Sequence, residues 1–142
     1  MKTRLIFIPG DPPTITSQMK RLRVVNGVPM FYHSKEYKAQ ERRAIDQLAA
    51  NAPDKPSELP VSVSIRFLFA HRKSDSNLFK TVSMFVPKHT RPDVDNMTKF
   101  ILDCMTKAGY WRDDALVSRL SVTKRWAVDP MTVINVEEDR IP

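Results

Sequence analysis

The amino-acid sequence predicts an α+β fold, in which a mixed β-sheet packs with two main helices in a single domain spanning residues 1–142. Residues 34–51 and 97–108 carry apolar side chains at helical spacing, and residues 61–69 alternate apolar and polar side chains as a half-buried strand does. These strands and helices do not alternate regularly along the chain, which argues against a repeated βαβ architecture.

The first expected elements are a strand and a hairpin. Residues 4–8 form a short strand, which a turn rich in proline and glycine ends. Residues 23–25 and 28–32 flank Asn26-Gly27, a pair that tolerates the positive φ of a tight hairpin turn. Pro29 lacks a backbone N–H, so we expect the second strand of this hairpin at an edge.

A helix and a second hairpin follow. Ser34 can cap a helix over residues 34–51, and the loop after it contains several prolines. The strand at 61–69 is the clearest β signal of the chain. Residues 81–87 are the next strand candidate, and we expect them to pair with 61–69 across a long polar tip.

The last third predicts one helix and two strands. The apolar stripe over residues 97–108 marks the helix, and Gly109 supplies its C-terminal stop. Residues 116–128 and 131–137 complete the chain as strands, with a turn at Asp129-Pro130.

Charge is distributed unevenly along the chain. The net charge is +7, yet an acidic stretch at residues 93–114 lies between basic stretches at 19–43 and 71–91. Carboxylates repel phosphate unless a cation stands between them, so this pattern favours a metal-dependent enzyme acting on nucleic acid. The candidate DNA-binding residues are Lys20, Arg21, Arg23, Arg72, Lys73, Lys88 and Arg91.

Other features exclude several classes of protein. No apolar run approaches the roughly 20 residues that span a bilayer, and the N-terminus lacks a secretory signal, so we expect a soluble, cytoplasmic protein without membrane contact. Cys104 is the lone cysteine, which leaves no disulfide or thiolate zinc site, and we expect it to be a buried apolar residue.

Two acidic pairs frame the helix at 97–108. Asp93 and Asp95 can project from the start of the helix towards one cation, and Asp113-Asp114 can join them if the next strand returns beside that turn. Carboxylate oxygens suit Mg²⁺. Lys99, one helical turn after Asp95, can hold a carboxylate, steer phosphate or stabilise charge in the transition state.

Structural roles remain open for the same acids. Asp93 or Asp95 can simply accept backbone N–H bonds at the helix start, and Asp113-Asp114 can be an ordinary turn into a strand. Asp103 can be a solvated acid or pair with Lys107.

The stretch RPDVDNMTKFILDCMTKAGYWRDDALV resembles the core of the RusA-type Holliday-junction resolvases, a family of crossover junction endodeoxyribonucleases. The shared pattern is a DxDN turn, an early helix lysine, an aromatic turn and a DD pair. PGDPPTITSQMKR, VNG and FYHSKEYK extend the resemblance over most of the chain, although the basic run before DxDN is thinner than in some relatives.

The resemblance implies a RusA-like fold and a catalytic site made of Asp93, Asp95, Asp114 and Lys99, with the three acids and also Asp113 as candidate metal ligands. It implies a homodimer that uses Mg²⁺, with Mn²⁺ able to substitute, and resolves four-way DNA junctions by paired symmetric nicks in recombination and repair. The interface is left open between residues 28–32 and the final strand. Alternatives are a DNA-binding module without turnover and a small-molecule metal phosphohydrolase.

Overall fold

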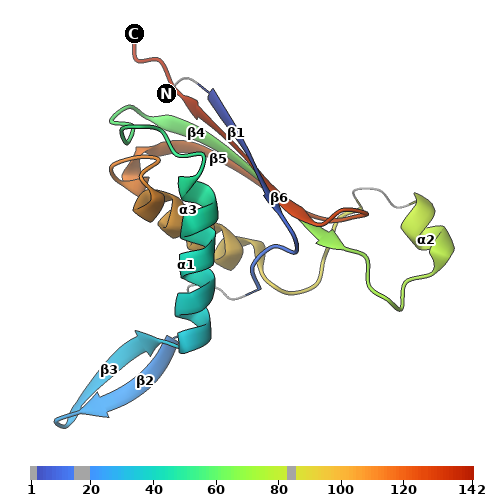
Figure 1. The fold of residues 1–142 in the computed structure, drawn as a ribbon, viewed down its shortest axis with the longest axis horizontal. Helices are drawn as coiled ribbons and strands as arrows, with labels where there is room; N and C mark the ends of the chain where they lie inside the picture. Colours follow the sequence, from blue (N-terminus) through green and yellow to red (C-terminus); the bar gives the residue numbers. More distant parts are fainter. Residues whose placement is uncertain (1–2, 15–19, 83–85) are drawn as a thin grey trace.

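The computed structural model describes residues 3–14, 20–82 and 86–142. Its main sheet has four strands in the order β1-β6-β4-β5. Strand β6 runs antiparallel to β1 and β4, whereas β4 and β5 are parallel. Helices α1 and α3 cover one face of this sheet (Figure 1), which confirms the predicted α+β class. The bounds are β1 Thr3–Pro9, α1 Lys35–Ala49, β4 Val61–Ala70, α3 Val94–Ala108, β5 Val117–Ala127 and β6 Met131–Glu138.

The hydrophobic core lies between this sheet and the two helices. Ile65 of β4 and Ile134 of β6 pair across the sheet and are fully buried. Leu48 of α1 and Phe100 of α3 are equally inaccessible and belong to the same core cluster. Burial of each such side chain contributes roughly 1.5–3 kcal/mol, so the core holds α3 firmly against the sheet.

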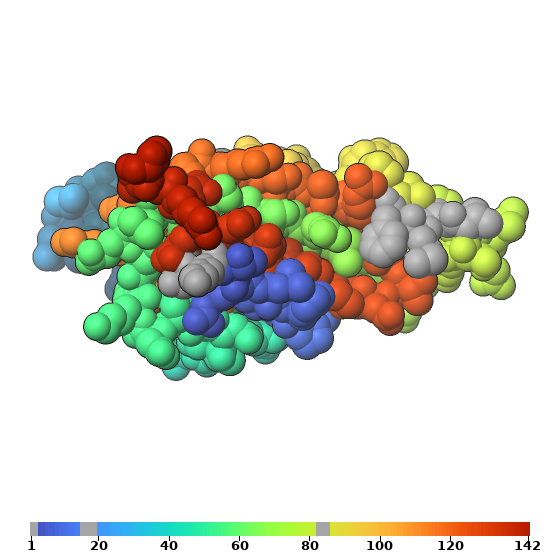
Figure 2. All heavy atoms as spheres, turned by 90° about the horizontal axis from the view of Figure 1, so that it is seen from above, coloured from blue at the N-terminus to red at the C-terminus, as the bar shows by residue number. Residues whose placement is uncertain are grey.

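The opposite face of the sheet is open (Figure 2). The strand register aligns Leu5, Asn135, Ser64 and Ser121 in one row across the four strands, on the face opposite the buried Ile65 and Ile134. This row is mostly short and polar, as expected for a sheet that faces water on one side.

The predicted hairpin is confirmed as β2 (Lys20–Val25) and β3 (Val28–His33), which form a separate two-stranded sheet. Its turn has φ of 50° at Asn26 and 74° at Gly27, the positive values that a tight hairpin turn needs. The hairpin projects past the start of α1, away from the main sheet (Figure 1).

Both predicted helix boundaries are confirmed. The Oγ of Ser34 accepts the backbone N–H of Tyr37 at 3.2 Å and caps α1. Gly109 has φ of 87°, and its N–H donates to the carbonyls of Met105 and Thr106 at the end of α3. A left-handed residue at this position is the usual way to stop a helix.

The predicted strand at 81–87 is wrong. Residues Asn77–Val82 form the short helix α2, begun by Ser76, whose Oγ accepts the N–H of Phe79 at 3.1 Å. Residues 83–85 lie outside the described residues. Strand β4 has no free edge for such a partner, because β5 and β6 occupy both of its sides. Pro87 instead makes an isolated bridge with Arg125 of β5.

In the described parts of the chain, none of the helices combines the length and apolar character needed to cross a bilayer.

Candidate active site

The start of α3 carries the first acidic pair. Asp93 occupies the N-cap position, with φ of −72° and ψ of 139°, but its side chain makes no capping hydrogen bond. Asp95 lies in the first turn, and both side chains are exposed. The capping role that the sequence left open is therefore not how Asp93 is used.

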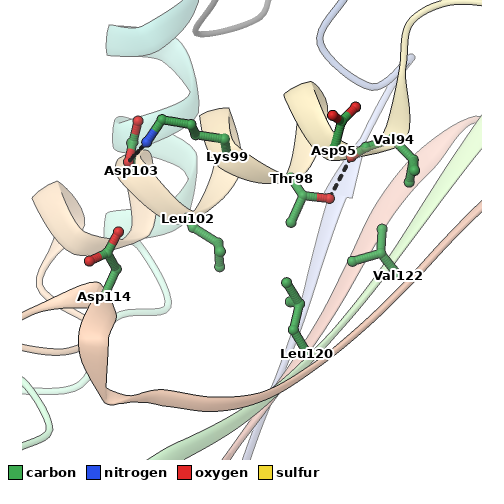
Figure 3. Close-up of a pocket in the computed structure, with 9 residues that line it drawn as sticks. All are labelled: Val94, Asp95, Thr98, Lys99, Leu102, Asp103, Asp114, Leu120 and Val122. Atoms are coloured by element: carbon green, nitrogen blue, oxygen red, sulfur yellow. Dashed lines mark hydrogen bonds and ion pairs between the residues drawn. The ribbon is translucent and has the colours of Figure 1, made fainter.

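A groove of about 450 Å³ runs between α3 and the first half of β5 (Figure 3). Asp95 lies where α3 begins, and Asp114 lies beside the second half of the helix, near Asp103. The following strand thus returns beside the helix and brings Asp95 and Asp114 to one groove. The lining residues are Val94, Asp95, Thr98, Lys99, Leu102, Asp103, Asp114, Leu120 and Val122.

Lys99 lines the same groove but pairs with a different acid from the one expected. Its Nζ lies 3.6 Å from a carboxylate oxygen of Asp103, one turn further along α3. The expected pair of Asp103 and Lys107 is not formed, because Lys107 reaches across to Glu41 of α1 at 2.9 Å. The Lys99 side chain remains 63% exposed, so an incoming anion can reach its ammonium group.

The second acidic pair divides into two roles. Oδ1 of Asp113 accepts the N–H of Ala115 at 2.8 Å and caps the short 3-10 helix η1 (Asp114–Leu116). Asp114 lines the groove instead. Asp113 thus has the turn role that the sequence left open, while the neighbouring carboxylate faces the candidate site.

The position of Asp114 depends on two buried aromatic residues just after α3. The hydroxyl of Tyr110 donates to the carbonyl of Leu48 at 2.7 Å, and Nε1 of Trp111 donates to Oγ1 of Thr106 at 2.8 Å. Burial raises the pKa of Tyr110 to about 12, so the phenol keeps the proton that this bond uses. Ser57 adds backbone bonds on both sides, to Tyr110 and Arg112.

Lys88 is not a surface cation. Its residue is 8% exposed, and its Nζ donates to the carbonyl of Arg91 at 2.9 Å. Lys124 of β5 reaches the same loop, with Nζ 2.6 Å from the carbonyl of Pro92. No local signal in the sequence marks Lys124, because only its place on β5, beside residues 86–88, brings it to this loop.

The other DNA-binding candidates are spread over the molecule. Lys20, Arg21 and Arg23 are exposed on β2, whereas Arg72 and Lys73 precede α2 at the far end of the molecule (Figure 1). Arg72 is partly engaged, with a nitrogen 3.2 Å from Asp75 and its guanidinium 5.4 Å from the Trp126 ring. Arg91 is exposed two residues before Asp93. The structure does not gather these cations into one patch.

The groove fits a hard divalent ion in its donor chemistry. Asp95 and Asp114 carry oxygen atoms of the kind that Mg²⁺ prefers, and one or two carboxylates commonly suffice when a substrate phosphate completes the shell. The two acids lie at opposite ends of the groove (Figure 3). Within residues 3–14, 20–82 and 86–142, no three His, Cys, Asp or Glu side chains are close enough to share one ion. The described site therefore offers carboxylates without a closed three-residue cage.

Comparisons with known proteins identify the family of this chain. The sequence model of "Endodeoxyribonuclease RusA" matches residues 9–137. A crossover junction endodeoxyribonuclease from Lactococcus phage r1t is 29% identical over 143 residues, which covers 99% of this chain and 95% of the phage protein. The RusA protein of Escherichia coli strain K12 is 42% identical over 43 residues, 30% of this chain and 36% of its own length. This chain therefore belongs to the RusA family of endodeoxyribonucleases, as the resemblance of its acidic core predicted.

Proposed function

We propose that this protein is a single-domain, Mg²⁺-dependent endonuclease that resolves four-way DNA junctions by paired symmetric nicks, acting in the cytoplasm in recombination and repair. One observation carries the proposal: Asp95 and Lys99 of α3 and Asp114 of η1 line one groove. The names of the relatives support the choice of branched DNA as substrate.

Asp95 and Asp114 are the proposed metal ligands, and Asp93 joins them from the N-cap of α3. A metal ion bound there supplies charge neutralisation at the scissile phosphate and lowers the pKa of water. Mn²⁺, which prefers similar ligands, is expected to substitute. Asp113 is left out of the ligand set because its carboxylate already caps η1.

Lys99 is proposed to orient the scissile phosphate. Its ammonium group belongs to an i,i+4 pair with Asp103 at 3.6 Å, and such exposed pairs are worth only about 0.3–0.5 kcal/mol. A phosphate that enters the groove can therefore draw Lys99 away from Asp103 at little cost. Asp103 then serves to keep the lysine near the groove when no DNA is bound.

The duplex arms are proposed to contact Arg21 and Arg23 on the hairpin, Arg91 beside the acidic turn, and Arg72 and Lys73 before α2. Their separation along the molecule suits a substrate with several arms better than a small phosphate ester. Contacts of this kind go to phosphates and carry no sequence information. Lys20 is also a proposed DNA contact. Lys88 is buried and is therefore not proposed to contact DNA.

We place the interface of the proposed homodimer on the β2–β3 hairpin. The final strand, β6, cannot pair with a second copy through its edge, because it lies between β1 and β4. One face of the hairpin pairs Leu22 with Phe31 and Val24 with Pro29. Phe31 is 73% exposed. A two-stranded hairpin is barely stable alone. Packing of its apolar face against a second copy of the chain would stabilise it.

The other hairpin face keeps its cations. Arg21 pairs with Tyr32 and Arg23 pairs with Met30, on the side opposite to Phe31. The alternation of side chains along the strand thus puts both arginines of β2 on the side away from Phe31, while Lys20 lies on the Phe31 side, at the base of the hairpin. Under this proposal the Phe31 side meets the partner, and the two arginines stay available to DNA.

A nicking assay on synthetic four-way junctions tests the proposed function. Paired nicks are expected with Mg²⁺ and not with a chelator, and Asp95→Asn should remove them while junction binding persists. Asp54→Asn, at an exposed loop acid, is the matched control. Tight junction binding with no cleavage under any divalent ion would instead identify a DNA-binding module.

A further inference from the structure

We propose that Lys88 and Lys124 are positioning residues that hold the turn before α3 through its backbone carbonyls, and thereby set where Asp93 and Asp95 stand. The inference rests on the proposed function, in which these acids hold the metal ion. Nζ of Lys124 donates to the carbonyls of Thr90 at 2.5 Å and Pro92 at 2.6 Å. Nζ of Lys88 donates to the carbonyl of Arg91 at 2.9 Å and also to Oγ1 of Thr90.

Three consecutive carbonyls thus accept from two ammonium groups immediately before Asp93. This feature, the lysine clamp, consists of Lys88, Lys124 and the carbonyls of residues 90–92. Hydrogen bonds to charged groups are stronger than those between neutral groups, so the clamp can hold this turn in one conformation.

The sheet brings the two lysines together. The N–H of Lys88 donates to the carbonyl of Lys124 at 3.0 Å, so residues 86–88 run along the second half of β5. The Lys88 ammonium lies 4.4 Å from the Trp126 ring and 5.0 Å from the Phe69 ring. These aromatic faces attract the cation and exclude water from it.

Placing two ammonium groups close together and burying one of them costs electrostatic free energy. Burial lowers the pKa of Lys88, and the neighbouring charges of Lys124 and Arg72 lower it further. Two cations placed side by side repel each other, and the aligned carbonyl dipoles offset that repulsion. An apolar pair could pack the same space without this cost, but it could not hold carbonyl oxygens.

The clamp also explains why Asp93 makes no cap bond. An N-cap side chain ordinarily accepts a backbone N–H and thereby stabilises its helix. Asp93 stands at that position without such a bond. With the preceding carbonyls fixed by lysines, the start of α3 is held from outside, and the Asp93 carboxylate stays available for another ligand.

The test replaces each ammonium group and keeps its volume. Lys88→Met retains contact with the aromatic rings, Lys124→Met removes the other cation, and Lys124→Arg should restore part of the effect. Lys55→Met, at an exposed loop lysine, is the control. We expect the Mg²⁺ concentration for half-maximal nicking to rise about 10-fold or more in both Met variants, the range typical for residues that orient metal ligands. Junction affinity without metal should stay unchanged.

Two measurements do not depend on cleavage. Amide exchange at residues 93–97 should speed up at least about tenfold in the Met variants, while exchange at residues 104–108 stays unchanged, because opening is local. Binding of Mn²⁺ alone, followed by calorimetry, should weaken in the same variants.

Three outcomes would overturn the inference. Uniformly faster exchange with normal metal dependence would make the lysines general supports of the fold. A loss of metal-free junction affinity would make them DNA contacts. Unchanged exchange at 93–97 would show that the turn needs no clamp. If the wild-type protein fails to cut junctions, the proposed function fails, but exchange and Mn²⁺ binding still decide the role of the clamp.

Discussion

The two ends of α3 hold their acids by different physical means. At the start, lysines bind loop carbonyls near the surface, and Asp93 and Asp95 are exposed. At the end, Tyr110 and Trp111 are buried and fix the chain that leads to Asp114. Substitutions at the start should therefore change metal use with little loss of stability, whereas those at the end should change stability first.

The largest effect is expected at the aromatic end. Trp111→Ala should lower the free energy of unfolding by about 3–5 kcal/mol, since it leaves a cavity in a closed core. Urea unfolding measures this loss, and Trp111→Phe should recover most of it. A loss below about 1 kcal/mol would mean that burial of Trp111 contributes little to the stability of the fold at this end of α3.

Next come the acids in the groove. Asp95→Asn and Asp114→Asn should each slow nicking at least about 100-fold, because a metal ion contributes several kcal/mol of charge stabilisation. Thermal unfolding and metal-free junction binding should remain near the wild-type values. Near-normal turnover in either variant would remove that acid from the proposed ligand set.

A smaller effect is expected at Asp113. Asp113→Ala loses the bond to the Ala115 N–H and should cost about 0.5–2 kcal/mol of stability, as lost caps do. Nicking per folded molecule should fall less than tenfold, since the carboxylate is already used within the turn. Equal losses at Asp113 and Asp114 would contradict the division between a capping and a groove-lining acid.

The smallest effect is expected at Cys104, in the buried second half of α3. This thiol is fully buried, and burial raises its pKa to about 12. Because the thiolate is the reactive form, labelling by a disulfide reagent at pH 8 should proceed only as fast as the protein unfolds. Fast labelling of the native protein would show that this part of α3 separates from the core without global unfolding.

The sequence predicted the end of α3 better than its start. Gly109 and the aromatic turn are local signals, and the structure places both as expected. Lys124 is far from Asp93 in the chain, and it reaches the loop because residues 86–88 run along β5, which no local signal predicts. The pairing of Lys99 with Asp103 was missed for another reason: residues four before and four after Asp103 are both lysines, and helical spacing alone does not choose between them.

The strand predicted at residues 81–87 failed because tertiary contacts, and not local sequence, decide the structure there. Residues 81–87 alternate like a strand, yet β4 already has a partner on each side. The hairpin was easier, because Asn26-Gly27 determines its own turn locally. The assignment of Asp93, Asp95 and Asp114 as metal ligands stays a prediction. Asp95 and Asp114 line the groove, but Asp93 does not.

The position of β6 determines when the nuclease can take shape during synthesis. β6 follows the other described strands in the chain, yet it lies inside the sheet, with Thr3 of β1 opposite Glu137 and β4 on its other side. Strand β1 therefore has no partner in the sheet until β6 has been made, and contacts this distant in sequence form slowly. The acidic residues are translated earlier but are assembled into a stable groove only afterwards. The sheet beneath the groove is thus fully paired only after β6 has been synthesised.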